Sequence, residues 1–552
     1  MRTVPRLLSL ITATAMLLLT GSYAASAATL DNASVGAERD TALIAADYEE
    51  VGSTLSPDTA LPSAYSGRDL GYTTAVRSQV YNTCWAYSST AILETAMNRS
   101  GDTTEFLSPM HMNFWATTRS DGTGWNRTYS EAGYPYIALG YLTSWIGARL
   151  DSEFPTSTPF SRYSELDASS APYAGVTSLM YIDGSDIDTV KTAIYDYGAV
   201  VGNFHYDATR LNDTTSAYYY ETPGLSTASL FGHSVALVGW DDSFPRESFV
   251  EDYRPDSDGA WLCKNSWGST WCSDGGYFWI SYEDEYLFDS RFGPSYAFTG
   301  YQLLSQSNRM KQCETYGSTY DFSYVNSAVR TRMTYANVLD FSDEYDVIDK
   351  VIFESTAEGS DYEIYYIPVD TAGIPDDNQS HWRLLYSGTI AYQGYTCADI
   401  DNIVVTDDRC AIGVTILKTD ASDSLNIGVD EWISVSRLGK YIFLPDTDYG
   451  KSYLLGYDVE PVDAMDFYRD ELSDDIGGTF VIKAATTTLG PLGDADLDGE
   501  VTIFDVTRIQ RYLAHMTTFN EQQLLLADFD GDGIVTIVDA TYIQRFLAGY
   551  LD

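Results

Sequence analysis

The chain has 552 residues, several times the ~100 to 150 residues of a typical domain, so we expect two or three folded units with separate cores. Hydrophobic residues make up 44% and aromatic residues 14% of the chain, which excludes an intrinsically disordered protein. The 79 acidic and 32 basic residues give a net charge of −47, which repels phosphate backbones and anionic membranes. Nucleic acid is therefore not an expected partner. The acidic surface either keeps an extracellular protein soluble or, in part, binds Ca²⁺.

The N-terminus has the three parts of a secretory signal peptide. Arg2 and Arg6 form a basic region, residues 7–19 are apolar, and residues 25–27 (ASA) form a small-residue cleavage site. The alternative, a membrane anchor, needs about 20 apolar residues, and neither this run nor any later one reaches that length. We therefore expect a signal peptide over 1–27, a secreted mature chain and no membrane span.

Residues 28–60 are polar and are predicted to be a short pro-segment or an extended arm. Residues 61–298 mix helical and strand patterns, which predicts an α+β domain. Its clearest elements are a helix capped by Asn82 or Thr83 and strands at 234–240 and 276–282. The six cysteines are too few for a disulfide framework in a chain of this length, although spacing alone leaves two pairings open. These pairings are Cys397 with Cys410 and Cys263 with Cys272.

Residues 299–484 consist of short β-type runs separated by Asp, Gly, Pro and Ser, which predicts a β-sandwich. The expected strands cover 347–354, 362–369, 411–417, 441–444 and 479–482. The domain serves either for packing and substrate positioning or for contact with carbohydrate or protein. Residues 485–491 are predicted to be a linker because Thr, Gly and Pro replace the apolar periodicity.

The last 60 residues contain a duplication, in which residues 494–514 recur at 528–548 with a shift of 34. Each copy places carboxylates at loop positions 1, 3, 5 and 12, Gly at position 6 and a backbone carbonyl at position 7, as a Ca²⁺ loop requires. A helix is expected after each loop. The predicted ligands of two structural Ca²⁺ ions are Asp494, Asp496, Asp498, Glu500 and Asp505, then Asp528, Asp530, Asp532, Ile534 and Asp539.

The duplicated loops, with Asp at position 12 and no helix before the first loop, resemble a dockerin domain over residues 492–552. The resemblance implies a small all-α domain that docks in a Ca²⁺-dependent manner onto a cohesin module of a scaffolding protein, as in cellulosomes. It also implies that cohesin binds at helix-face residues near the loops. The matching positions are Ile503, Phe504, Gln510, Arg511, Ile537, Val538, Gln544 and Arg545.

Three polar residues point to nucleophilic catalysis. Cys84 begins the predicted helix, where the helix N-terminus and a nearby imidazolium lower the pKa of a thiol. His233 at the start of a strand can take the thiol proton, and the amide of Asn265 can fix the histidine tautomer. A transglutaminase-type reaction ranks last, because it would require an Asp in place of Asn265.

These segments resemble the papain-like cysteine proteases over residues 61 to about 290. The matching residues are Leu61-Pro62, Gln79, Cys84-Trp85, His233 with Gly239, Lys264 to Gly268, and Gly276-Tyr277. The resemblance implies a two-lobe fold, with Cys84 as nucleophile, His233 as base and Asn265 as orienting group. It also implies that Gln79 and the Cys84 backbone N–H form the oxyanion hole, and that Trp267 shields the Asn–His hydrogen bond.

The expected whole is a multidomain α+β protein: a papain-like peptidase, a lectin-like β domain and a dockerin. Its expected function is that of a secreted cysteine endopeptidase, attached to a cohesin-bearing scaffold and acting on protein or peptide substrates without a catalytic cofactor. The alternative is a catalytically weak papain-like binding subunit whose β domain contacts carbohydrate or protein. The spacing of five residues from Gln79 to Cys84, where the family usually has six, favours that alternative.

Overall fold

The computed structural model describes residues 60–550 with internal gaps. The gaps are 103–104, 119–124, 126, 168–169, 227–228, 315–316, 318–319, 323–329, 342–345, 406–407, 419–424, 434–448, 457–459, 472–475 and 531–532. The expected signal peptide, the 28–59 segment, the expected strand at 441–444 and Asp532 therefore lie outside the described residues. No helix among the described residues combines the length and apolar character needed to cross a membrane.

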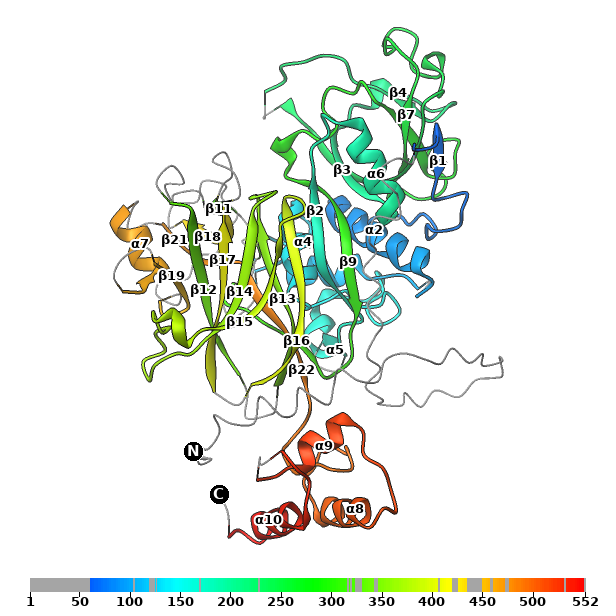
Figure 1. Ribbon diagram of the computed structural model, residues 1–552. Helices are drawn as coiled ribbons and strands as arrows, with labels where there is room; N and C mark the ends of the chain where they lie inside the picture. Colours follow the sequence, from blue (N-terminus) through cyan, green and yellow to red (C-terminus); the bar gives the residue numbers. More distant parts are fainter. Residues whose placement is uncertain are drawn as a thin grey trace.

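A helical lobe forms the first half of the peptidase domain (Figure 1). Its helices are α2 (Cys84–Ser100), α3 (Pro109–Trp115), α4 (Pro135–Thr143) and α5 (Tyr163–Asp167). Helix α2 is buried on most of its surface, including Trp85, Ile92 and Leu93, so it is the central helix of the domain. It ends at Gly101, whose φ of 85° is the left-handed conformation that glycine favours.

The second lobe of the peptidase is a β structure with one covering helix, α6 (Ile187–Tyr197). The strands are β1 (Ala64–Ser66), β2 (Ala174–Ile182), β3 (Val200–His205), β4 (Leu211–Asn212), β5 (Ala217–Tyr218), β6 (Gly232–Asp241), β7 (Ala260–Lys264), β8 (Tyr277–Ser281) and β9 (Ser295–Leu303). Strand β6 pairs with β3 on one side and β7 on the other, both antiparallel. The expected strands at 234–240 and 276–282 correspond to β6 and β8.

The second domain is built from sheets packed around a common apolar core, consistent with the expected sandwich. Outside the gaps given above, a sheet of six described strands has the order β15-β14-β17-β12-β19-β20, and a smaller sheet has the order β11-β18-β21. Their bounds are β11 (Tyr320–Phe322), β12 (Arg332–Asp340), β14 (Asp361–Ile367), β15 (Arg383–Thr389), β17 (Arg409–Leu417), β18 (Ile427–Ile433), β19 (Ser452–Leu455), β20 (Val462–Asp463) and β21 (Ile476–Phe480). Helix α7 (Ala464–Glu471) packs against β21.

One sheet continues from the peptidase into the second domain. Strands β10 (Asn308–Lys311), β13 (Asp346–Ser355), β16 (Gly394–Val405) and β22 (Ile482–Thr488) extend it. The junction is the antiparallel pairing of β16 with β2, in which Tyr395 lies opposite Leu179. The sheet has thirteen strands within the described residues. The domain boundary expected at 298–299 falls inside β9, because that strand pairs along its whole length with β2.

The linker expected over 485–491 is wrong for most of its length. Residues 484–488 form part of β22, which pairs with β10 and β13. The strand is buried over residues 482–486 and half-buried at Thr487 and Thr488, and β-branched threonines suit such positions in a sheet. Only residues 489–491 separate this strand from the C-terminal domain.

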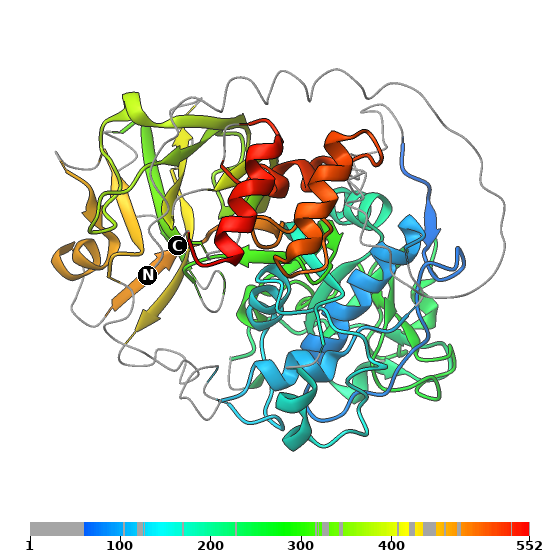
Figure 2. The same cartoon turned by 90° about the horizontal axis from the view of Figure 1, so that it is seen from below.

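The described residues of the C-terminal domain form three helices, α8 (Ile503–Leu513), α9 (Glu521–Ala527) and α10 (Ile537–Leu547). Figure 2 shows α8 and α10 side by side, and their buried residues Val506, Ile509, Ala540 and Ile543 form the core. The short helix α9 was not expected from the sequence. Its Leu526 packs with Val347 and Leu489, so it joins this domain to the end of the thirteen-stranded sheet.

Candidate active site and calcium loops

Cys84 is the first residue of α2, with Thr83 at the N-cap position. The Thr83 hydroxyl makes no cap to the helix and donates instead to the Val80 carbonyl. The thiol therefore lies at a helix end whose backbone N–H groups and dipole favour an anion. Burial raises the pKa of Cys84, while the backbone N–H of Ser234, the residue after His233, opposes that rise.

His233 lies near the start of β6 and is buried. Its Nε2 donates to Asn265 Oδ1 over 2.8 Å. The same Oδ1 accepts from the Ser266 backbone N–H over 2.8 Å, which identifies it as the amide oxygen. Nε2 therefore carries the proton and Nδ1 is left as the base. Burial lowers the pKa of His233 to about 4, and the bond to Asn265 acts in the opposite direction.

Asn265 directly follows β7, and its backbone N–H donates to Gly276 across the sheet. The Trp267 ring stacks on the His233 imidazole, with ring centroids 4.3 Å apart and planes at 22°. Tyr206 contacts the same Trp267 edge-on at 4.8 Å. The structure thus brings three sequence-predicted residues together: His233 and Asn265 are buried, and Trp267 is half-buried.

Gln79 is tied to the segment that carries Asn265. Its backbone N–H donates to the Ser266 carbonyl over 2.6 Å, and its Oε1 accepts from the Ser266 hydroxyl over 2.7 Å. Its Nε2 donates to the Tyr81 carbonyl over 3.0 Å. Because a side-chain amide nitrogen has two hydrogens, one donor remains for a substrate oxygen.

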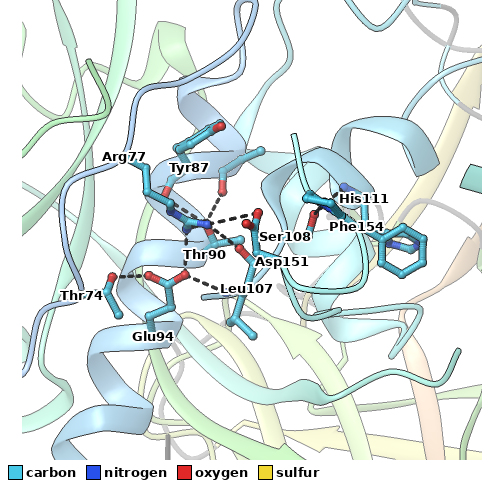
Figure 3. A network of polar contacts seen from close by, with 12 residues as sticks. Thr74, Arg77, Tyr87, Thr90, Glu94, Leu107, Ser108, His111, Asp151 and Phe154 are labelled. Atoms are coloured by element: carbon cyan, nitrogen blue, oxygen red, sulfur yellow. Dashed lines mark hydrogen bonds and ion pairs between the residues drawn. The ribbon is translucent and has the colours of Figure 1, made fainter. Parts of the chain in front are cut away.

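A buried charge network behind α2 was missed by sequence reasoning (Figure 3). Glu94 is fully buried in the middle of α2 and pairs with Arg77 Nη2 at 2.7 Å. It also accepts from the Thr74 hydroxyl, which in turn accepts from Lys264 Nζ over 2.7 Å. The signal in the sequence was a single carboxylate within the apolar stretch 91–97 of a helix.

This network joins three segments of the active site. Arg77 precedes Gln79 by two residues, Lys264 precedes Asn265, and Glu94 lies on the helix that begins with Cys84. Burial lowers the pKa of Lys264 to about 8. A buried network of this kind holds its members in one arrangement, because losing one partner leaves an uncompensated charge. It therefore positions Gln79 and Asn265 relative to α2.

The first C-terminal loop gathers carboxylate oxygens of Asp494, Asp496 and Asp505 within 4.8 Å of one another. Asp496 Oδ1 is buried without a hydrogen-bond partner, and burial with neighbouring carboxylates raises the pKa of Asp496. A buried carboxylate oxygen that has no hydrogen-bond partner and lies close to other carboxylates is suited to bind a cation. The carboxylate of Asp498 lies outside this oxygen group, and Glu500, whose backbone carbonyl is the predicted ligand at position 7, belongs to the same loop.

The second loop repeats the arrangement with Asp528, Asp530 and Asp539, again within 4.8 Å. Asp532 is outside the described residues, and Ile534 is exposed in the same loop. Asp539 Oδ2 also accepts from the Thr536 backbone N–H over 2.7 Å, which caps α10. The position-12 carboxylate of each loop is thus both in the oxygen group and at the first turn of a helix.

The residues predicted to face a partner lie on the surface of α8 and α10. Ile503 and Phe504 are 53% and 69% exposed, and Ile537 and Val538 are 56% and 45% exposed. The polar positions that accompany them on the two helices are exposed as well: Gln510, Arg511, Gln544 and Arg545. Within the part of the chain that the structure describes, none of the six cysteines forms a disulfide, so neither pairing considered from the sequence is present.

Three regions of the chain match known families. Residues 61–291 match the papain family of cysteine proteases, residues 311–467 a lectin-like domain, and residues 492–548 a type I dockerin domain.

Among solved structures, the chain is similar to the clostridial cysteine protease Cwp84 after propeptide cleavage. The identity is 30% and the TM-score 0.67, covering 77% of this chain and 100% of that one. It is equally similar to the cysteine protease and lectin-like domains of Cwp84, a surface-layer-associated protein of Clostridium difficile. There too the identity is 30% and the TM-score 0.67, with 78% of this chain and 90% of that one covered.

Two cathepsin relatives each match less than half of this chain. Procathepsin L of Felis catus is 29% identical over 221 residues, which are 39% of this chain and 59% of the relative. Cathepsin Q of Rattus norvegicus is 24% identical over 216 residues, 38% of this chain and 56% of the relative. The chain therefore spans less than two thirds of the length of either relative.

Proposed function

Because the chain belongs to the papain family of cysteine peptidases, we propose that it is a secreted endopeptidase that cleaves peptide bonds with the thiolate of Cys84. Its C-terminal dockerin domain attaches it to a cohesin-bearing scaffold of the cellulosome type. The observation that carries the catalytic part is the buried His233–Asn265 hydrogen bond, with the next residue, Ser234, directed at the Cys84 thiol.

In the proposed reaction, the proton of the Cys84 thiol passes to His233 Nδ1. Both groups are neutral when considered separately, since burial raises the pKa of the thiol and lowers that of the imidazole. The thiolate therefore forms by transfer within the pair rather than by proton loss to water. The helix N-terminus stabilises the thiolate, and the Asn265 carbonyl oxygen stabilises the imidazolium.

The thiolate attacks the carbonyl carbon of the scissile bond to form a tetrahedral oxyanion. Gln79 Nε2 and the Cys84 backbone N–H donate to that oxygen, each worth about 2.7–4 kcal/mol by analogy with other oxyanion-hole donors. His233 then protonates the leaving amine, and the C–N bond breaks to leave a thioester. Water, deprotonated by His233, hydrolyses the thioester and regenerates the thiol.

The catalytic proposal is tested by labelling the purified mature chain with an epoxide-type inhibitor of thiol proteases. We expect stoichiometric labelling that is absent in Cys84→Ala and strongly reduced in His233→Ala. A folded chain that takes up no label would contradict the proposal. In that case the alternative, a catalytically weak binding subunit, would be favoured.

That alternative rests on one specific observation. Gln79 lies five residues before Cys84, and its Nε2 already donates to the Tyr81 carbonyl. If this bond held both amide hydrogens away from the substrate, oxyanion stabilisation would be lost. The labelling experiment combined with a peptide-hydrolysis assay separates the two functions, because alkylation reports the activated nucleophile and turnover reports oxyanion stabilisation.

The docking proposal rests on the two groups of loop carboxylates and on the exposed apolar residues that follow them. Each group, led by Asp494 or Asp528, would hold one structural Ca²⁺ ion, which neutralises the clustered charge and orders the following helix. Ile503, Phe504, Ile537 and Val538 would contact the cohesin. Chelation should abolish cohesin binding and leave peptidase activity unchanged. Equal loss of both would contradict separate domain functions.

The proposed location is outside the cell, on a scaffold or the cell surface. The basic and apolar regions of residues 1–27 support secretion, and the dockerin supports attachment. The similar protein Cwp84 is described as surface-layer-associated. Fractionation of a producing culture, with the chain followed by antibody, tests this location, and recovery in the cell interior would contradict it.

A further inference from the structure

Two half-exposed tyrosines lie in contact beside the nucleophile. Tyr81 and Tyr129 are each 45% exposed, and their rings meet edge to face with centroids 5.2 Å apart. Tyr81 is three residues before Cys84, whereas Tyr129 comes from a segment of the helical lobe 48 residues further along. Because the two exposed rings are in contact, they form a continuous aromatic patch and not two isolated exposed side chains.

The pair has a rigid support. The Tyr129 ring stacks on Phe160 at 4.9 Å, and Phe160 stacks on the buried Tyr163 at 5.0 Å. The Tyr129 carbonyl accepts from the buried Asn113 side chain over 2.9 Å. The two rings are therefore held in place before any ligand arrives, which lowers the entropic cost of binding to them.

Tyr81 is also connected directly to the proposed oxyanion hole. Its carbonyl oxygen accepts from Gln79 Nε2 over 3.0 Å, so the residue lies one hydrogen bond from a group that would contact the substrate carbonyl. Its φ is 62°, a left-handed conformation that costs energy for a bulky side chain and suits Gly or Asn better. This backbone conformation fixes where the Tyr81 side chain leaves the chain, next to the proposed oxyanion hole.

We propose that Tyr81 and Tyr129 form an aromatic shelf that binds a large apolar or aromatic side chain of the substrate next to the scissile bond. The shelf offers flat apolar area for packing, and its two hydroxyl groups keep it soluble when no substrate is bound. A large apolar side chain should be preferred over a small or acidic one, because it buries more apolar surface against the two rings. This inference rests on the proposed peptidase function of Cys84.

The test measures kcat/KM of the full chain on internally quenched peptides that differ at one residue beside the scissile bond. That residue is Phe, Leu, Ala or Asp, on the acyl side in one series and on the leaving-group side in the other. We expect a preference of about tenfold or more for Phe and Leu over Ala in one series. In the double variant Tyr81→Ser/Tyr129→Ser, the ratio of kcat/KM for the Phe peptide to kcat/KM for the Ala peptide should fall towards one. The change should come mainly from a higher KM for the Phe peptide.

Two further variants serve as controls. Tyr81→Phe keeps the ring and should keep the preference, as should Tyr386→Ser, which changes an exposed tyrosine of β15 in the lectin-like domain. An unchanged preference in the double variant would overturn the shelf. So would an equal loss on all peptides, because that result would make the tyrosine pair a brace for the nucleophile loop.

Failure of the peptidase function is distinguishable from failure of the shelf. If the wild-type chain cleaved no peptide, binding of the Phe and Ala peptides to a Cys84→Ala chain would be compared by calorimetry. Tighter binding of the Phe peptide that disappears when both tyrosines become Ser would support the shelf without catalysis. Equal binding of the two peptides to the Cys84→Ala chain would overturn it.

Discussion

His233 and Asn265 are joined by a 2.8 Å hydrogen bond although 32 residues separate them in the chain. The contact exists because β6 and β7 are antiparallel neighbours, with Ala236 opposite Lys264, so that the start of β6 meets the end of β7. The Trp267 ring stacks on the imidazole. The bond selects the histidine tautomer that leaves Nδ1 free as a base.

Removing the orienting amide should slow catalysis without abolishing it. In Asn265→Ala, we expect kcat to fall by about tenfold or more, because the imidazole can adopt the wrong tautomer and the imidazolium loses its partner. Steady-state hydrolysis of a peptide substrate measures the effect. Asn265→Gln serves as the comparison, and an unchanged kcat in Asn265→Ala would show that His233 is oriented by its packing alone.

Gln79 should contribute to transition-state binding and little to substrate binding. Gln79→Ala is expected to lower kcat by about 10²- to 10³-fold with KM nearly constant, as for the loss of one oxyanion-hole donor. Gln79→Glu removes the amide donor at similar size and is the matched variant. A loss of only twofold would mean that Nε2 stays on the Tyr81 carbonyl during the reaction.

The buried histidine should weaken the fold at acid pH. Burial lowers the folded-state pKa of His233 to about 4, below the unfolded value of about 6.5. Between these values the unfolded chain binds a proton that the folded chain does not, so stability falls as pH drops from 6.5 to 4, by about 3 kcal/mol. Urea unfolding should show His233→Gln gaining stability relative to wild type over this range. A difference that does not change with pH would contradict the prediction.

Calcium should stabilise the dockerin domain selectively. At a free Ca²⁺ concentration 100 times the dissociation constant, one site contributes about 2.7 kcal/mol, so chelation should lower the melting temperature of this domain. Scanning calorimetry of the full chain, with and without chelator, measures the shift. Asp494→Ala and Asp528→Ala should each remove part of it, and a chelator shift that persists in the double variant would place the ions elsewhere.

The peptidase and lectin-like domains should unfold together. Lys483 of β22 and Glu314 are both fully buried and 2.8 Å apart, and Lys483 Nζ donates to Thr143 Oγ1 at the end of α4 over 3.0 Å. Lys483→Met leaves the buried Glu314 carboxylate without its ion-pair partner and is expected to lower the free energy of unfolding by about 3–5 kcal/mol. The double variant Lys483→Met/Glu314→Gln should recover much of that loss in urea unfolding. Separate transitions for the two domains in wild type would contradict their coupling.

The sequence alone indicated the candidate site, because the signals for it are local. A helix beginning at Cys84, Asn265 directly before Ser266 and Trp267, and carboxylates at alternate positions of a loop each depend on a few neighbouring residues. The prediction of a linker at 485–491 was wrong because it, too, used only local information. A Thr-rich run reads as a loop in isolation but forms a strand when β10 and β13 lie on either side of it.

By itself, the sequence determined the three-domain order, the residue types for nucleophilic catalysis and the duplicated cation loops. Only the tertiary structure decided how these parts are held. The Arg77–Glu94–Lys264 network, the Tyr81–Tyr129 contact and the junction of β16 with β2 all join residues distant in the chain. Such pairings depend on strand register and on which buried charges meet, and local periodicity carries no information about either.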